Sequence, residues 1–199
     1  MEKMAKRLTD WLITKEAVSI DEKELYEFGI FHLLLNIIDT VSILLLALLF
    51  REVISTVFYI ICFCTLRRYA GGYHAKTVFT CYLLTLTAAL GMLVLLKQFD
   101  FIAPVQFAIW FISGMIILLF APIQNANKIL DDIEIIVYKR RAIITWFVQT
   151  IGMVLLYQIG FSNCFEAILI SHMYVAFSML AEKTKLIVVN NEIRSTRVR

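Results

Sequence analysis

Six long apolar runs, separated by short polar breaks, constrain this chain more than any other feature of its sequence. Of its 199 residues, 60% are hydrophobic and only 18% are charged. A soluble domain of this size cannot bury so much apolar surface, whereas an α-helix crosses the apolar core of a bilayer with about 20 residues. The pattern therefore predicts an all-α integral membrane bundle of about six transmembrane helices.

Charged or glycine-containing segments bound the predicted spans. The spans cover about residues 30–50, 53–69, 77–96, 101–121, 142–160 and 165–181, and residues 182–199 follow as a basic tail. Pro122 is expected to stop the fourth span because proline cannot continue a helix. Two prolines and seven glycines leave no room for a flexible linker, so we expect one membrane domain over residues 1–199.

The region before the first span, residues 1–29, has a different pattern. Met4, Leu8, Trp11 and Leu12 recur at helical spacing, which is typical of an amphipathic helix lying in the membrane interface. A cytosolic helix packed on a loop is the alternative. Residues 19–22 have the form of a capping box and predict the start of a second helix.

The basic residues are distributed unevenly between the two sides of such a bundle. With six spans, 17 of the 19 Lys and Arg residues lie on one side, and only Arg51 and Lys97 lie on the other. Cytoplasmic loops carry the excess of positive charge. The count predicts a multi-pass cell-membrane protein with both termini in the cytoplasm.

Chemistry-bearing residues gather around the junction of the second and third spans. They are Arg67, Arg68, Gly71, Gly72, His74 and Cys81. A thiolate is a good nucleophile, and a neighbouring imidazole commonly deprotonates the thiol. On one straight helix, Cα atoms seven residues apart would be separated by about 10.5 Å. The glycines allow the chain to turn before the third span, which would let His74 fold back toward Cys81. The alternative is an ordinary small packing cysteine.

Other polar residues in the spans have two readings. His32, Asn36 and Asp39 share one face of the first span, so Asn36 or Asp39 is a candidate to orient the imidazole of His74. The alternative is a structural seam between helices. Ser171 and His172 are expected to bond to neighbouring helices, and Cys62 and Cys64 are expected to be packing residues.

The pattern Arg67-x4-Gly72-x-His74-x6-Cys81 resembles the signature of the accessory gene regulator B (AgrB) family, membrane peptidases of Gram-positive quorum sensing. Similar segments are residues 26–29 at the entry to the first span, 120–122 at the end of the fourth, and 127–128 beyond it. The resemblance implies that His74 and Cys81 are the catalytic pair. Arg67 and Gly72 match the other motif positions.

The resemblance also implies a substrate and a reaction. The substrate would be a short AgrD-like propeptide, cleaved through a thioester on Cys81 and then cyclised to a thiolactone or a lactone. We expect basic residues on this side to attract its acidic tail, unless they serve only topology and contact with anionic membrane lipid. The best placed are Arg67, Arg68, Lys128, Lys139, Arg140 and Arg141. No metal, cofactor or nucleic acid is expected, and homodimerisation is left open.

Two other classes of function compete with a peptidase. A non-catalytic peptide exporter or membrane scaffold would need a polar path through the bilayer, but the polar residues concentrate toward one side. A lipid head-group enzyme would need a carboxylate cluster to bind metal, and Asp131, Asp132 and Glu134 are too sparse for one.

Overall fold

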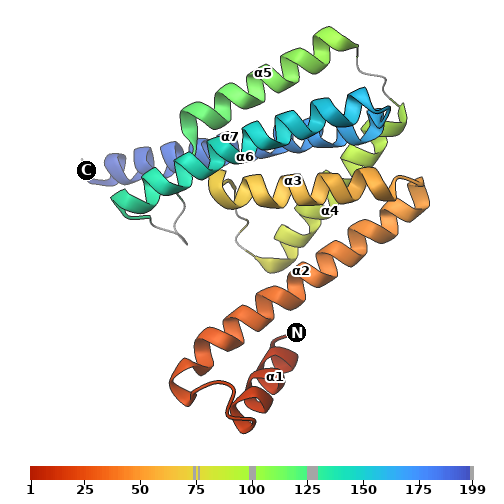
Figure 1. Cartoon of the computed structure of the whole chain (residues 1–199). Helices are drawn as coiled ribbons and strands as arrows, with labels where there is room; N and C mark the ends of the chain where they lie inside the picture. The colour runs from red at the N-terminus through yellow and green to blue at the C-terminus, as the bar shows by residue number, and fades with distance from the viewer. Residues whose placement is uncertain (74, 76, 99–101, 125–129, 198–199) are drawn as a thin grey trace. The chain divides into compact units, whose positions relative to one another are not determined.

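The computed structural model describes residues 1–73, 75, 77–98, 102–124 and 130–197, with side chains as far as Val188. The helices in chain order are α1 (Glu2–Thr14), the 3-10 turn η1 (Ile20–Glu22), α2 (Lys23–Phe50), α3 (Val53–Ala70), α4 (Val78–Gln98), α5 (Ala103–Phe120), α6 (Asp132–Gln158) and α7 (Ser162–Arg197) (Figure 1). These residues form no strand, only an isolated bridge between Gly71 and Ile123. The predicted all-α fold is confirmed.

Five helices within the described residues are long and apolar enough to cross a membrane. They are α2 with η1, α3, α4, α5 and α7 as far as Val188. Helices suit these apolar segments because a helix satisfies its own backbone hydrogen bonds where lipid offers no partner. The predicted fifth span falls in α6, which is not among the five. Beyond the basic residues 139–141, the part of α6 that covers 142–158 has a length of about 25 Å, at 1.5 Å per residue.

The chain divides into two compact units, 1–46 and 47–199. In the first unit, α1 is amphipathic as predicted, with Met4, Leu8 and Trp11 exposed. The second helix starts at the expected place, but the Ser19 hydroxyl donates to the Glu22 carboxylate rather than capping the backbone. An ion pair of 2.6 Å joins Lys23 of α2 to Asp10 of α1.

In the second unit, α7 packs against α3, α4, α5 and α6. Alanines lie fully buried where these helices meet, among them Ala70, Ala89, Ala142 and Ala167. Large apolar residues such as Leu119, Val148 and Phe177 point outward. Small residues let membrane helices approach closely, so this outward-facing apolar surface is that expected of a bundle in lipid.

Polar side chains also join the helices of the second unit. The side-chain oxygen of Gln149 in α6 accepts from Nε2 of His172 in α7 at 2.9 Å, and its amide nitrogen donates to the Thr65 hydroxyl and the Cys62 carbonyl of α3. The expected interhelical role of His172 is confirmed. Ser171 instead donates to the Ile168 carbonyl of its own helix.

Two predicted boundaries were wrong. Residues 132–141 are not a connecting loop but the start of α6, because Asp131 and Glu134 form a capping box there, with the Glu134 amide donating to Asp131 at 2.6 Å. Residues 182–197 are not a separate tail, since α7 continues through them. Both segments are polar, and polar composition alone does not separate a loop from an exposed helix, because Glu and Lys are good helix formers.

Candidate functional site

Cys81 lies in the first turn of α4. Thr77 precedes the helix and caps it, since its hydroxyl accepts from the Thr80 amide at 3.2 Å and its carbonyl accepts from the Cys81 amide at 3.1 Å. The side chain of Cys81 is half-buried. The first turn of a helix has free amide groups and partial positive charge, which favour an anion. The prediction that a helix starts near residue 77, with Cys81 close to its beginning, is confirmed.

Gly71 and Gly72 make the turn between α3 and the residues that lead to α4. Both have positive φ angles, +79° and +148°, that other residues rarely adopt. A Cβ on Gly71 would collide with the Ile123 carbonyl, and one on Gly72 would lie 2.5 Å from the Ser178 hydroxyl. The predicted turning role is confirmed, and the close packing gives a second reason for glycine at both positions.

Arg67, near the end of α3, holds this turn in place. Its guanidinium donates to the Tyr73 carbonyl and to the Ser178 hydroxyl of α7. The Tyr73 amide in turn donates to the Ser178 hydroxyl at 2.9 Å and to the Ser178 carbonyl at 3.0 Å. A planar guanidinium with five donors is suited to such a double contact. We call this set, Arg67, Tyr73 and Ser178, the loop clamp.

The segment after α5 supports the same turn from another side. The chain leaves α5 through a cis peptide between Ala121 and Pro122. The next amide, of Ile123, donates to the Ala70 carbonyl at 2.9 Å, and Ile123 forms the parallel bridge with Gly71. Three separate parts of the chain therefore fix the backbone from Ala70 to Tyr73.

The α7 side of the site was not anticipated from the sequence. Ser178, Glu182 and Lys185 recur at spacings of four and three residues and so share one face of the helix. Glu182 is buried and pairs with Lys185 at 3.2 Å, and the Lys185 ammonium lies 5.1 Å from the centre of the Tyr73 ring. A single serine forms no recognisable motif. This shared face could be predicted only if the helix were known to continue past residue 181.

Arg67 also connects the clamp electrostatically to the cysteine. Its guanidinium lies within electrostatic range of the Cys81 and Cys64 side chains and of the Glu182 carboxylate. Cys81 is thus the half-buried thiol that lies in a first helical turn and within range of a held cation. Such surroundings are typical of reactive rather than structural cysteines.

The remaining cysteines differ in their surroundings. Cys62 is buried among Met153, Ile168 and Leu169, so its predicted packing role is confirmed. Cys64 is exposed on α3, so the expectation of a packing role is wrong for it. Cys164 is buried at the start of α7, 4.0 Å from the Ser55 hydroxyl.

The predicted supporting residues are only partly brought to the site. Arg68 and Arg141 are exposed and lie 6.0 and 5.7 Å from the centre of the Tyr69 ring, which places the basic stretch 139–141 beside the end of α3. Asn36 and Asp39 lie on α2 within the first compact unit, and their role toward His74 stays a prediction. His74 and Lys128 lie outside the described residues.

No group of three His, Cys, Asp or Glu side chains suited to a metal ion occurs within the described part of the chain. The described residues of the site offer a thiol, a held guanidinium and exposed basic side chains.

Apolar spanning helices, with a polar cluster at one end of the bundle, define a polytopic α-helical membrane protein that carries a candidate thiol nucleophile. The chain belongs to the accessory gene regulator B (AgrB) family, whose sequence profile matches residues 5–179. This membership supports a role in the processing of the quorum-sensing peptide of the accessory gene regulator system.

Two relatives from Clostridium perfringens are similar over much of their length. An AgrB-like protein of strain SM101 (Type A) is 23% identical over 177 residues, which are 81% of each chain. The AgrB-like protein 2 of strain 13 (Type A) is 24% identical over 136 residues, 64% of this chain and 63% of that protein. No solved structure matches the chain.

Proposed function

We propose that the protein is a membrane cysteine endopeptidase that removes the C-terminal tail from an AgrD-like propeptide. The observation that carries this proposal is the placement of Cys81, half-buried in the first turn of α4 and within electrostatic range of Arg67. Family membership supports peptide processing as the context. The turn from Ala70 to Tyr73, which hydrogen bonds fix, immediately precedes His74 in the sequence.

The proposed reaction has two covalent steps. His74 takes the proton from the Cys81 thiol, and the sulfur attacks the peptide carbonyl at the end of the signal sequence. The C–N bond then breaks, the proton passes from the imidazolium to the leaving amine, and a thioester remains on Cys81. A thiol or hydroxyl within the bound peptide next attacks the thioester carbonyl, and the bond from that carbonyl to the Cys81 sulfur breaks. The nucleophile's proton passes through His74 to the sulfur, which regenerates the Cys81 thiol as the thiolactone or lactone closes. Holding that internal nucleophile close favours cyclisation over hydrolysis.

Substrate capture is proposed to use the exposed basic side chains at this end of the bundle. All four described basic residues are exposed. Arg68 lies in the last turn of α3, and Lys139, Arg140 and Arg141 lie in the first part of α6. Their charges would attract an acidic peptide tail. We also propose that Lys128 helps to attract the acidic tail and that Asn36 or Asp39 orients the imidazole of His74.

We also propose that α6 is a sixth span, which places both termini in the cytoplasm of a cell-membrane protein. Its outward face is apolar, with Ile144, Phe147, Val148 and Ile151 exposed. Its inward face packs against α3, α5 and α7, including a stack of Trp146 on Trp110 at 5.4 Å. A helix packed along three spanning helices shares their surroundings, and six spans reproduce the uneven distribution of basic residues.

The experiment that tests the proposal is intact-mass spectrometry of the full-length protein reconstituted in vesicles with an AgrD-like propeptide. We expect a covalent adduct on Cys81 with the mass of the trimmed peptide, and no adduct in Cys81→Ala. Cys164→Ala is the matched control, because it removes a buried thiol elsewhere in the same bundle. Normal processing by Cys81→Ala would overturn the mechanism, and a peptide that crosses the vesicle uncleaved would favour an exporter.

A further inference from the structure

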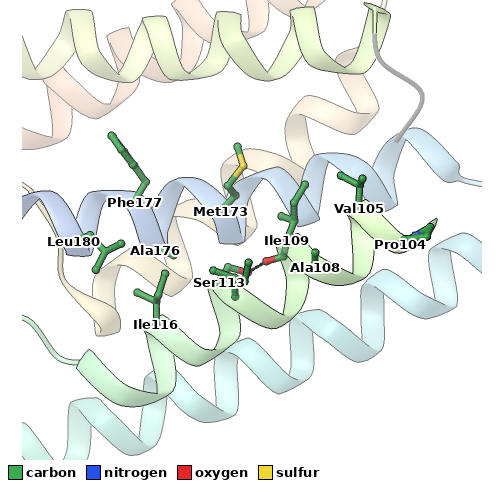
Figure 2. A pocket seen from close by; sticks show the side chains of 11 residues that line it. Pro104, Val105, Ala108, Ile109, Ser113, Ile116, Met173, Ala176, Phe177 and Leu180 are labelled. Atoms are coloured by element: carbon green, nitrogen blue, oxygen red, sulfur yellow. Dashed lines mark hydrogen bonds between the residues drawn. The ribbon is translucent and has the colours of Figure 1, made fainter. Parts of the chain in front are cut away.

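A groove between α5 and α7 lies on the outer surface of the second compact unit. It has a volume of about 470 Å³, within the range typical of small-ligand sites. Figure 2 shows the side chains that line it, which come from α5 and α7. They are Pro104, Val105, Ala108, Ile109, Ile112, Ser113, Ile116, Met173, Ala176, Phe177 and Leu180.

The lining offers a ligand almost no polar contact. Ser113 is the one hydroxyl among these residues, and it donates within its own helix to the Ile109 carbonyl at 2.6 Å. Ile112 and Phe177 are 57% and 70% exposed along the groove. Since α5 and α7 are both apolar enough to span a membrane, the groove opens toward acyl chains and accepts an apolar ligand.

One end of the groove carries a positive charge. Lys183 follows the lining residue Leu180 by three positions on α7, and Phe120 follows Ile116 by four on α5, so each shares a helix face with a lining residue. The Lys183 ammonium lies 3.4 Å from the centre of the Phe120 ring. A cation is favoured there because Phe120 is the last residue of α5, at the negative end of the helix dipole.

We propose that this groove binds an anionic phospholipid, with one acyl chain between α5 and α7 and the phosphate beside Lys183. The apolar lining alone would also accept a helix of a second copy. The charge at its end selects the phospholipid, because an ammonium has three donors and the ring contact leaves N–H groups for phosphate oxygens. The site is separate from the loop clamp, since Ser178 lies on a different face of α7 from Phe177 and Leu180.

Native mass spectrometry of the full-length protein tests the proposal, with phosphatidylglycerol and phosphatidylcholine supplied in equal amounts. Lys183→Gln should lower the preference for phosphatidylglycerol about fivefold, the factor expected for one basic residue near an anionic surface. Lys185→Gln is the matched control, because that ammonium already pairs with Glu182 at 3.2 Å and should leave the preference unchanged.

A second variant tests the groove itself. Ala108→Phe should fill it and lower the number of retained lipids of both kinds, whereas Ile151→Phe on the outward face of α6 should not. Unchanged lipid selectivity in Lys183→Gln would overturn the proposal. So would an Ala108→Phe protein that keeps its lipids but changes from oligomer to monomer, because the groove would then belong to a second copy. If Ala108→Phe does not fold, the Lys183→Gln result still decides.

Discussion

The two ends of the bundle in the second compact unit each hold a charged side chain in a hydrogen-bond network, but they hold it differently. At one end, Glu52 between α2 and α3 accepts from Lys97 of α4 at 2.7 Å, from Asn163 of α7 at 2.8 Å and from Ser55 at 2.8 Å. At the other end, Arg67 donates to a backbone carbonyl and a hydroxyl. The first charge hydrogen-bonds directly to an opposite charge, whereas the second hydrogen-bonds to neutral oxygens and has the Glu182 carboxylate only within electrostatic range.

The difference separates a structural tie from a candidate site. Glu52 and Lys97 form a closed pair that joins three helices and has little charge left for a ligand. Arg67 makes no such direct ion pair and lies within electrostatic range of Cys81 in α4. We therefore expect substitutions at the Arg67 end to change processing, and substitutions at the Glu52 end to change stability.

Gly72→Ala should have the largest effect on processing. The added methyl group would lie 2.5 Å from the Ser178 hydroxyl and 3.1 Å from the Arg67 guanidinium, at a φ of +148°. Backbone strain of this kind costs about 3 kcal/mol, which corresponds to about a 100-fold lower kcat/KM if the turn must hold its shape. The kcat/KM for cleavage of the propeptide by the reconstituted protein measures this effect. Gly152→Ala in α6 is the control, since a methyl there meets nothing within 4 Å.

Arg67→Lys should lower kcat/KM about 30-fold, because a lysine keeps the charge but cannot reach the Tyr73 carbonyl and Ser178 together. The same assay measures the rate, and circular dichroism checks that the helices persist. A rate close to that of the unchanged protein would show that charge alone suffices and that the clamp geometry has no part in processing.

Ser178→Ala should lower kcat about fivefold, since it removes a hydroxyl that accepts from both Arg67 and Tyr73 while the Ser178 carbonyl still holds the Tyr73 amide. Ser113→Ala provides the comparison, because that hydroxyl bonds only to carbonyls of its own helix. Equal rates in the two variants would remove Ser178 from the site.

Glu52→Gln should change processing least, by less than about twofold, and lower the melting temperature by a few degrees. Although burial opposes ionisation, hydrogen bonds from Lys97, Ser55 and Asn163 hold the pKa of Glu52 below its ordinary value of 4.5. The ionised form therefore stabilises the fold above pH 4.5, and this stabilisation is lost as the pH falls through the lowered pKa. Melting scans from pH 7 to pH 3 should show an acid-dependent loss that Glu52→Gln lacks.

Local patterns were sufficient to predict the helices and the position of Cys81 in the third predicted span. Apolar runs of about 20 residues identify membrane helices because lipid requires continuous apolar length. The turn at Gly71 and Gly72 was also predictable, since glycine tolerates positive φ. The position where α6 begins and the length of α7 were not predicted, because polar helices and polar loops have similar composition.

Residue order alone thus established a helical membrane protein with a thiol beside a glycine turn, because hydropathy and backbone preference act over neighbouring residues. The partners of Arg67 were decided by packing, since Ser178 lies 111 positions away in the chain and meets it only when α7 lies against α3. The same packing decided that Glu52 forms a direct ion pair with Lys97, whereas Arg67 hydrogen-bonds to neutral oxygens. Such contacts depend on how helices associate, which no local pattern in the chain encodes.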